Sequence, residues 1–517
     1  MRHFAQDIHE VVLDGQSLSI DKVVAVARHQ AVVSLSPKAA KAIEASRRLV
    51  EKIVDEGRVV YGITTGFGDF SKIHIGKEQS AKLQENLILS HCCAVGEPLN
   101  IETVRAMMLL RANALAKGHS GIRRELVEAL IAMLNCGVYP VVPRQGSLGA
   151  SGDLAPLSHM ALVLIGRGEA TYQGVRMPGK EAMDKAGIPI HQLLAKEGLA
   201  LINGTQCMTA IGALAWYDLN RAAQLADIIA GLTLQALTGL ISAFDERLHA
   251  LRPHPGQKLV AKNMRLMLEG SVAAKENLAL RVQDAYTLRC IPQVHGAVRD
   301  ALLHAKGVLE IEMNAVTDNP VLFLEDESVI SGGNFHGEPV ALVMDYLSTA
   351  AAELASISER RLERMVNPSL SNGLPPFLAS NGGINSGFMI CQYSAASLVS
   401  ENKVFAHPAS VDSIPSSANQ EDHVSMGTTA AHNLRRIVNN VFSVLAFELM
   451  AAAQATDMRG NLEELSDVQK QVFHLVREKI PFISKDKEIA PHIACMNTLI
   501  RSGRIEQTVL STLHEFA

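Results

Sequence analysis

Aromatic residues are scarce in this sequence. Phe, Trp and Tyr make up 4% of its 517 residues, with a single Trp, although hydrophobic residues as a whole make up 48%. Aromatic and β-branched residues favour strands, whereas Ala and Leu, which dominate here, favour closely packed helices. The composition therefore predicts a large, mainly α globular protein.

The sequence also lacks an excess of positive charge. Its formal net charge is −5 and charged residues make up 20% of the chain, so neither nucleic acid nor an anionic membrane is an expected partner. No apolar stretch of the signal-peptide kind follows the first residues. The most apolar long run, 228–244, contains several polar residues and suits a buried core helix better than a membrane span. We expect a cytoplasmic protein.

Cysteines are few and show no C-x-x-C spacing. The seven stand at positions 92, 93, 136, 207, 290, 391 and 495. Disulfide frameworks and zinc sites need cysteines at paired spacings, so the pattern predicts buried, reduced thiols and no metal site. Asn203-Gly204-Thr205 matches a glycosylation sequon. Because a cytoplasmic protein is not glycosylated there, Asn203 needs another explanation.

The glycine-rich segment 146–155, GSLGASGDLA, does not match a nucleotide-binding loop. Neither G-x-G-x-x-G nor G-x-x-x-x-G-K-[ST] occurs in it. An isolated Ala-Ser-Gly is compatible with a plain glycine-rich turn, but the tripeptide Ala150-Ser151-Gly152 can also react with itself.

In that reaction the backbone nitrogen of Gly152 attacks the carbonyl carbon of Ala150. Loss of two waters then leaves a five-membered ring with an exocyclic methylidene derived from Ser151. Ala150 is small, Ser151 carries a hydroxyl that can be eliminated, and Gly152 lets the backbone fold back sharply. Ordinary side chains provide no good electrophile, so chemistry that needs one usually borrows a cofactor. This chain can build its own.

Capping signals outline the helices around this segment. Ser36 and Pro37 predict the start of a helix that runs to Gly57. Asp153 resembles the N-cap of a helix beginning near Leu154, whose positive end would increase the electron demand of a neighbouring ring. Three further helices are expected at 80–95, 101–117 and 122–136, because each of these segments has helical periodicity and is followed by Gly. We divide the chain into a mixed N-terminal region, a central region of long helices and C-terminal capping helices, at 1–200, 201–455 and 456–517.

Several motifs together resemble the aromatic amino acid ammonia-lyase family. They occur in the family's order from about residue 11 to about residue 459: YGITTGFG (61–68), LQENLILSH (83–91), GSLGASGDLAPLSH (146–159), INGTQ (202–206), VQDAYTLRCIPQVHGA (282–297), GGNFHGEP (332–339), NSGFMI (385–390) and SSANQEDHVSMG (416–427). The resemblance implies a long-helix bundle of the ammonia-lyase and fumarase-like type, with a smaller mixed N-terminal region carrying the loop. It also implies that Ala150-Ser151-Gly152 matures to a methylidene-imidazolone (MIO), with no external cofactor. The resemblance further implies a homotetramer whose active sites draw residues from more than one subunit.

The resemblance also assigns catalytic roles. Elimination of ammonia from an α-amino acid needs a base for a weakly acidic β-proton, which typically contributes about 10²–10⁴-fold. Tyr61 and Tyr286 are the candidates; we favour Tyr61 as the base and leave the assignment open. Asn203 is implied to hydrogen-bond the ring and the substrate amine, and Asp153 to orient and polarise the ring.

A carboxylate clamp is expected near Tyr286. Gln283, Tyr286 and Arg289 are spaced by three, so on a helix they share one broad face before Pro292 ends it. The guanidinium fork of Arg289 matches a substrate carboxylate in two-point geometry. Without the family match, an ion pair between Arg289 and Asp284 would be the simpler interpretation. Gln283 is expected to bind substrate alongside Arg289.

Substrate choice is expected to depend on His91 and Glu421. Ser90-His91 stands at the position implied to set selectivity, and His91 can hydrogen-bond an imidazole. Glu421 stands where family members that act on tyrosine or phenylalanine have Gln, and a carboxylate can pair with an imidazole N–H. Glu421 is implied to be catalytic as well, and Phe335 and Met389 are implied to form apolar walls.

The expected activity is elimination of ammonia from L-histidine to give trans-urocanate, the first step of histidine degradation. The alternatives are another MIO enzyme, either a tyrosine or phenylalanine ammonia-lyase or an aromatic 2,3-aminomutase, and a catalytically dead scaffold on the same fold. The intact tripeptide, both tyrosines and Arg289 argue against the scaffold.

Overall fold

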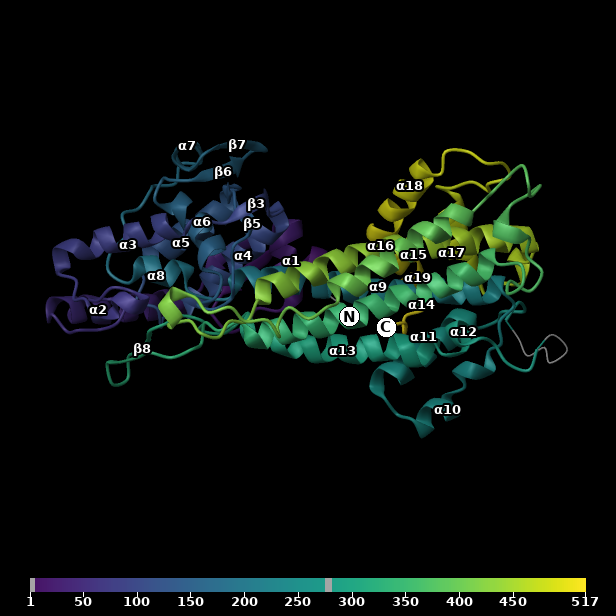
Figure 1. The fold of residues 1–517 in the computed structure, drawn as a ribbon, viewed down its shortest axis with the longest axis horizontal. Helices are drawn as coiled ribbons and strands as arrows, with labels where there is room; N and C mark the ends of the chain where they lie inside the picture. The colour runs from purple at the N-terminus through teal and green to yellow at the C-terminus, as the bar shows by residue number, and fades with distance from the viewer. Residues whose placement is uncertain (1–4, 275–280) are drawn as a thin grey trace. The chain divides into compact units, whose positions relative to one another are not determined.

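The computed structural model of the protein describes residues 5–274 and 281–517. Most of these residues are helical, as the composition predicted (Figure 1). Contacts divide the chain into two compact units: Met1–Tyr217, Ala305–Asp345 and Pro408–His432 form the first, and Asp218–His304, Tyr346–His407 and Asn433–Ala517 form the second. Each unit is therefore assembled from separated stretches of the chain. The division into three consecutive regions stays a prediction.

Short and medium-length helices build most of the first unit (Figure 1). They are α1 (Ile20–His29), α2 (Pro37–Asp55), α3 (Lys77–His91), α4 (Ile101–Ala116), α5 (Arg124–Cys136), α6 (Leu154–Leu164), α7 (Gly179–Lys185) and α8 (Glu197–Ile202). Ser36 caps α2 as expected, because its hydroxyl accepts a 3.1 Å hydrogen bond from the Ala39 N–H. Helix α3 ends at His91 rather than near residue 95, since residue 95 is already the first residue of strand β3. His91 is consequently at a helix end.

Four small sheets complete the first unit, as far as its residues are described. Strands β1 (Glu10–Leu13) and β2 (Val32–Leu35) pair in parallel, with Glu10 opposite Val32. The other three sheets are antiparallel: β3 (Val95–Pro98) with β5 (Pro143–Gln145), β4 (Tyr139–Pro140) with β6 (Glu169–Tyr172) and β7 (Val175–Pro178), and β8 (Val321–Phe323) with β9 (Ser328–Ile330). The mixed character expected of the N-terminal region is confirmed.

Helix α4 lies in the core of the first unit. Every residue from Thr103 to Ala116 is buried, as is typical of a helix that is apolar around its whole circumference. Its few polar side chains are therefore enclosed as well, and Arg105 and Arg111 are both buried there.

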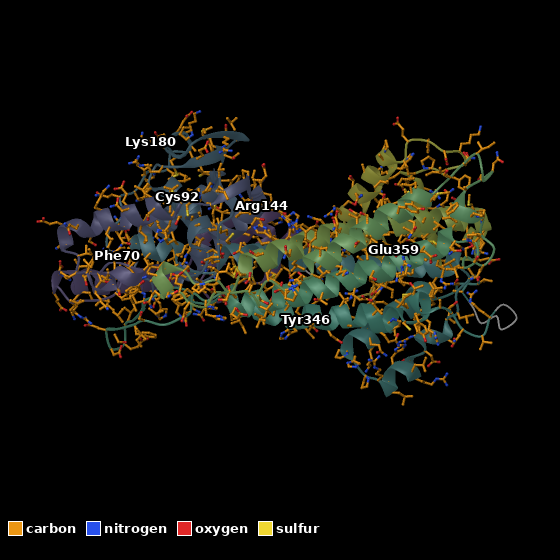
Figure 2. The ribbon with its side chains drawn as sticks, viewed as in Figure 1. Phe70, Cys92, Arg144, Lys180, Tyr346 and Glu359 are labelled. Atoms are coloured by element: carbon orange, nitrogen blue, oxygen red, sulfur yellow. The ribbon has the colours of Figure 1, made fainter. Side chains whose placement is uncertain are left out.

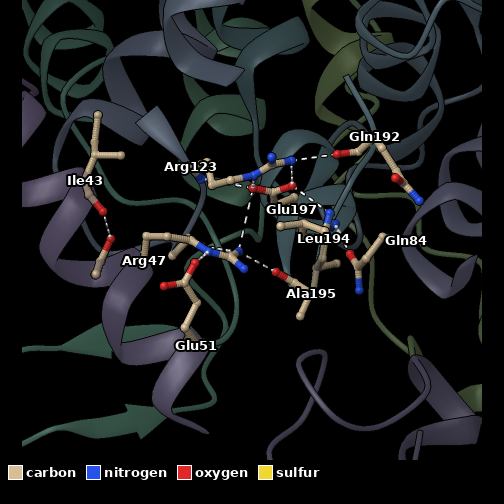
Figure 3. Close-up of polar contacts among 12 residues, drawn as sticks. Ile43, Arg47, Glu51, Gln84, Arg123, Gln192, Leu194, Ala195 and Glu197 are labelled. Carbon is tan, nitrogen blue, oxygen red and sulfur yellow. Dashed lines mark hydrogen bonds and ion pairs between the residues drawn. The ribbon is translucent and has the colours of Figure 1, made fainter. Parts of the chain in front are cut away.

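A buried ion cluster fixes the short helix α8 (Figure 3). The Glu197 carboxylate is fully buried and accepts hydrogen bonds from the Arg123 guanidinium at 2.7 and 2.8 Å and from the Leu194 N–H at 2.7 Å. Arg47 of α2 lies 3.6 Å from the same carboxylate and donates to the Ala195 carbonyl at 3.0 Å. Because α8 ends at Ile202 and Asn203 is its C-cap, this cluster also fixes where the loop that begins with Asn203 starts.

Long helices dominate the second unit (Figure 1). Its helices are parts of α9 (Gln206–Ala236), α13 (Ile291–Glu312), α14 (Glu338–Val366) and α16 (Gly427–Arg459), together with α10 (Glu246–Leu251), α11 (Pro255–Leu268), α12 (Tyr286–Arg289), α15 (Met389–Phe405), α17 (Asp467–Arg477), α18 (Ala490–Arg501) and α19 (Arg504–Thr512).

Glu448 of α16 ties three of these helices together. Its carboxylate is fully buried and accepts hydrogen bonds from Thr233 of α9 at 2.8 Å and Ser358 of α14 at 2.6 Å. Arg361 of α14 forms a two-point pair with it, at 2.6 and 2.9 Å. A buried charge persists only when it is paired and hydrogen-bonded, so this cluster specifies how the three helices align.

Within the described residues, α14 and α16 are long and apolar enough to cross a membrane by length and composition alone. However, 61% of the most apolar window of α14 and 83% of that of α16 are buried inside the protein. Core helices of globular proteins show the same burial.

The cysteines differ from expectation in their burial. All seven are free thiols, as predicted, but only Cys207 and Cys391 are buried. Cys93 and Cys136 are exposed, since both lie at or just after the end of a helix.

Candidate active site

A cavity of about 1050 Å³ lies within the first unit. Four stretches of chain contribute most of its lining: the loop after Tyr61, the last turns of α3, the segment 331–336 and the segment 417–423. Ala150, Ser151 and Asn203 also line it. Phe70, which Figure 2 labels, lines the cavity, and its side chain is 66% exposed.

The tripeptide Ala150-Ser151-Gly152 is held against the loop that follows α8. Gly152 and Gly204 form an isolated parallel bridge, and the Asp153 N–H donates to the Gly204 carbonyl at 2.7 Å. Gly152 has φ +73°, and a Cβ there would lie 2.2 Å from the Gly204 oxygen. Only glycine is therefore compatible with this approach of the two backbones.

Among the described residues, the side chains of Asn203 and Glu421 form hydrogen bonds with Ser151. The Asn203 side-chain amide donates from Nδ2 to the Ser151 carbonyl at 2.9 Å. The Ser151 hydroxyl donates to Glu421 Oε1 at 2.6 Å. A carbonyl oxygen can only accept, so Asn203 must present its NH₂ group here and aim Oδ1 elsewhere. Oδ1 is buried and has no hydrogen-bond partner among the described residues.

Asp153 does not cap α6 with its side chain. It occupies the N-cap position but makes no side-chain capping bond. Its fully buried carboxylate instead accepts hydrogen bonds from the Ser147 hydroxyl at 2.8 Å, the Met208 N–H at 2.9 Å and the Thr428 hydroxyl. Burial raises the pKa of Asp153, and these donors oppose the rise. The predicted N-cap position and helix start are therefore confirmed, but the carboxylate binds these donors, two of them on α9 and α16, instead of capping the helix.

Tyr61 and His91 line the same cavity. The Tyr61 hydroxyl accepts a 3.3 Å hydrogen bond from the Gly68 N–H, which holds the phenol within its glycine-rich loop. His91 Nδ1 lies 3.0 Å from the Ser90 hydroxyl. Burial lowers the pKa of His91, although a hydrogen bond at the Leu87 backbone and nearby Glu421 oppose this shift, so the ring is neutral at neutral pH.

The remaining predicted residues lie in the second unit and do not line this cavity. They are Gln283, Tyr286, Arg289 and Met389. The first three nevertheless lie together: Arg289 Nη1 donates to Gln283 Oε1 at 2.7 Å, and its guanidinium stands 4.8 Å from the centre of the Tyr286 ring. Tyr286 is 72% exposed.

The expected helix through these residues is corrected by the structure. Helix α12 contains only Tyr286–Arg289, and Gln283 precedes it. Pro292 lies in the first turn of α13, where its missing N–H costs nothing, so it helps to begin a helix rather than end one. Asp284 pairs with Arg281 at 2.6 Å and not with Arg289.

Two histidines of the cavity had not been singled out from the sequence. His336 follows Phe335, and His423 stands two residues after Glu421, so both lay inside motifs already recognised. Their rings stack with centres 5.7 Å apart. A closer look at the neighbours of each expected pocket residue would have found them.

Known proteins are similar to this chain in sequence and in fold. Residues 18–478 match the family described as "Aromatic amino acid lyase". The chain is 59% identical to a histidine ammonia-lyase of Caldanaerobacter subterraneus subsp. tengcongensis, over 97% of this chain and 98% of that one.

Solved structures of related proteins have a similar fold. Histidine ammonia-lyase from Trypanosoma cruzi has a TM-score of 0.91 and 43% identity, covering 97% of this chain and 95% of that one. Tyrosine aminomutase from Streptomyces globisporus has a TM-score of 0.94 and 38% identity, covering 97% and 98%. The expected ammonia-lyase type of fold is therefore confirmed. This chain belongs to the aromatic amino acid lyase family.

Proposed function

We propose that this protein eliminates ammonia from L-histidine to give trans-urocanate, as the first step of histidine degradation. The observation that carries the proposal is the joint presence of the tripeptide, His91 and Glu421 around one cavity, with Glu421 2.6 Å from the Ser151 hydroxyl. Relatives up to 59% identical that carry the name histidine ammonia-lyase support it.

The surroundings of Ala150-Ser151-Gly152 fit an MIO ring formed from these residues. The Ser151 carbonyl oxygen, which would belong to the ring, already accepts from Asn203 Nδ2 at 2.9 Å. The orphaned Asn203 Oδ1 is a buried acceptor that a substrate ammonium group can satisfy. The ring, once formed, supplies an electrophile that draws electrons from the departing amine. No external cofactor is required.

Side chains of the cavity are assigned to removal of the β-proton and to binding of the substrate. We assign removal of the β-proton to Tyr61, whose hydroxyl is held by the Gly68 N–H, with Tyr286 as the alternative base. The two nitrogens of the substrate imidazole can be bound by neutral His91 and by the Glu421 carboxylate. His91 presents a ring nitrogen to one of them, and Glu421 accepts the N–H of the other. Phe335 contributes an apolar wall, and Asp153 orients the loop.

A homotetramer with shared active sites would complete the cavity. Tyr286, Arg289 and Gln283 form a cluster outside the cavity of their own chain. We propose that another subunit supplies this cluster and Met389, so that Arg289 binds the substrate carboxylate. Exposed free thiols at Cys93 and Cys136 suit a reducing compartment, which supports a cytoplasmic enzyme.

The function is tested by incubating the purified protein separately with L-histidine, L-tyrosine and L-phenylalanine. Formation of urocanate, followed by its ultraviolet absorbance, is the expected result with L-histidine only. Formation of a coumarate, a cinnamate or a β-amino acid without urocanate would instead identify a lyase for another amino acid or an aminomutase. The likeness to a tyrosine aminomutase structure makes this comparison necessary.

A further inference from the structure

Arg111 is a buried cation that the proposed mechanism does not use. It lies on α4, and its guanidinium is fully buried. Nη1 donates to the Asn203 backbone carbonyl at 2.6 Å and to Gln206 Oε1 at 2.9 Å. Nε and Nη2 have no hydrogen-bond partner among the described residues. Leaving such donors unsatisfied is costly, so the position calls for an explanation beyond packing.

One buried carboxylate interacts with two buried cations beside this loop. Lys196 is also fully buried, and its Nζ lies 2.7 Å from Asp318 Oδ2. The same Asp318 is the carboxylate that interacts electrostatically with Arg111, so two cations share one anion. Burial lowers the pKa of Arg111 to about 10, which leaves the guanidinium charged at neutral pH.

The guanidinium of Arg111 contacts the backbone of Asn203. Arg111 binds the backbone carbonyl of Asn203, while the side chain of Asn203 donates to the Ser151 carbonyl oxygen at 2.9 Å. Gly204 makes this approach possible, since a Cβ there would lie 2.6 Å from Arg111 Nη1. Arg111 is thus connected to the Ser151 oxygen through one residue.

The Ser151 carbonyl oxygen is where negative charge accumulates during ring maturation. Dehydration breaks the Ser151 Cα–H bond, whose proton passes to solvent water, and the Cβ–Oγ bond, whose oxygen leaves as water after taking a proton from solvent. Between the two cleavages, the electron pair from the Cα–H bond is shared with the adjacent carbonyl oxygen. Donors aimed at such an oxygen in an enclosed site are usually the largest single contribution to catalysis.

We propose that Arg111 is a positioning residue that acts through Asn203 to stabilise negative charge on the Ser151 carbonyl oxygen. It thereby speeds dehydration of the tripeptide and increases the electron demand of the mature ring. The inference rests on the proposed function in so far as it requires the ring to form.

Arg111→Gln and Arg111→Lys test the proposal, with Arg105→Gln as the matched control. Arg105 is another buried arginine of α4, but it binds the Val26 and Leu134 carbonyls and the Tyr139 hydroxyl. Intact mass followed after synthesis reports dehydration, because the mature chain is lighter by two waters. The rate at which added cyanide increases the mass of the mature chain reports electrophilicity without any amino acid substrate.

Arg111→Gln is expected to slow both processes by about tenfold. This is less than the ~10²–10³-fold typical of deleting a direct oxyanion donor, because Arg111 acts through Asn203. Arg111→Lys is expected to retain most of both rates, and Arg105→Gln to keep them while lowering thermal stability. Wild-type rates in a folded Arg111→Gln variant would overturn the inference.

If Arg111→Gln does not fold, Gln206→Glu keeps Arg111 and places a carboxylate against Nη1. The Gln206→Glu variant should then react more slowly with cyanide than Gln206→Met, a variant without the added charge. Equal rates in the two variants would overturn the inference. A wild-type chain that is not lighter by two waters would instead overturn the proposed ring itself, so the two failures are distinguishable.

Discussion

The Ser151 hydroxyl donates a 2.6 Å hydrogen bond to the Glu421 carboxylate, which lies 270 residues further along the chain. The segment that carries Glu421 is closed by a bridge between Ser416 and Glu421, and the Ser416 hydroxyl donates to Glu421 Oε2 at 3.1 Å. The residue expected to become the electrophile and the residue expected to select the substrate are therefore in direct contact.

Ser151→Ala should abolish turnover. Without the hydroxyl no methylidene can form, so the chain should not become lighter by two waters and should lose activity on the order of 10³-fold or more. Intact mass and urocanate formation check this result. Because Ser151 is only one of the cavity residues, the unfolding temperature of the Ser151→Ala variant should differ little from that of the wild type. Substantial activity in a folded Ser151→Ala variant would refute the electrophile.

Glu421→Gln should weaken the use of L-histidine. An amide replaces the charge-assisted hydrogen bond to an imidazole N–H, worth about 1.5–3 kcal/mol, so kcat/KM should fall about 10- to 100-fold. Asp422→Asn is the matched control, because Asp422 also lines the cavity and removal of its charge should have a smaller effect. Equal losses in the two variants would mean that Glu421 has no specific role.

Mixing two inactive variants should restore activity if active sites are shared between subunits. Tyr286→Phe and Ser151→Ala disable different parts of the proposed site. After joint unfolding and reassembly, roughly one quarter of the sites should combine an intact loop from one chain with an intact Tyr286 from another. Each variant reassembled alone is the control. Mixtures as inactive as either parent would contradict the sharing of sites.

The stability of the protein should fall on acidification because of His295. Its Nε2 lies 3.3 Å from Arg361 Nη1, which can only donate, so Nδ1 must carry the proton that reaches Asp227 Oδ1 at 2.7 Å. Burial lowers the pKa of His295 below its ordinary 6.5. The unfolded chain therefore binds more protons than the folded chain just below pH 6.5, and stability falls as the pH drops through that range.

Urea unfolding at pH 7.5 and pH 5.5 measures this effect. His295→Gln should lose less stability between the two pH values than the wild type, since it removes the group that titrates. His254→Gln, a change at an exposed histidine, should behave like the wild type. The same pH dependence in all three proteins would show that His295 is not responsible.

Much of the fold was predictable because the signals are local. Ser36 and Pro37 begin α2 by capping and by a preset backbone angle, and Gly137, with φ +80°, ends α5. Pro292 was misinterpreted because a proline that would break a helix interior also suits a first turn. Only the position of the preceding helix end, at Arg289, distinguishes the two cases.

Burial was less predictable than helix position. Most of the seven cysteines are partly or fully exposed, although the residue type is usually buried. Arg111 stood in no recognised motif, and nothing in its neighbourhood along the chain distinguishes it from Arg105. Its contact with Asn203 depends on how α4 packs against a loop 92 residues away.

The sequence by itself determined the reactive tripeptide, since the proposed ring joins atoms of three consecutive residues, Ala150, Ser151 and Gly152. It also supplied the motifs that indicated the family. The tertiary structure alone decided which distant groups act on that tripeptide: Glu421 on the hydroxyl, Asn203 on the carbonyl oxygen and Arg111 behind Asn203. Such contacts depend on the packing of separate helices and loops, and no spacing along the chain encodes them.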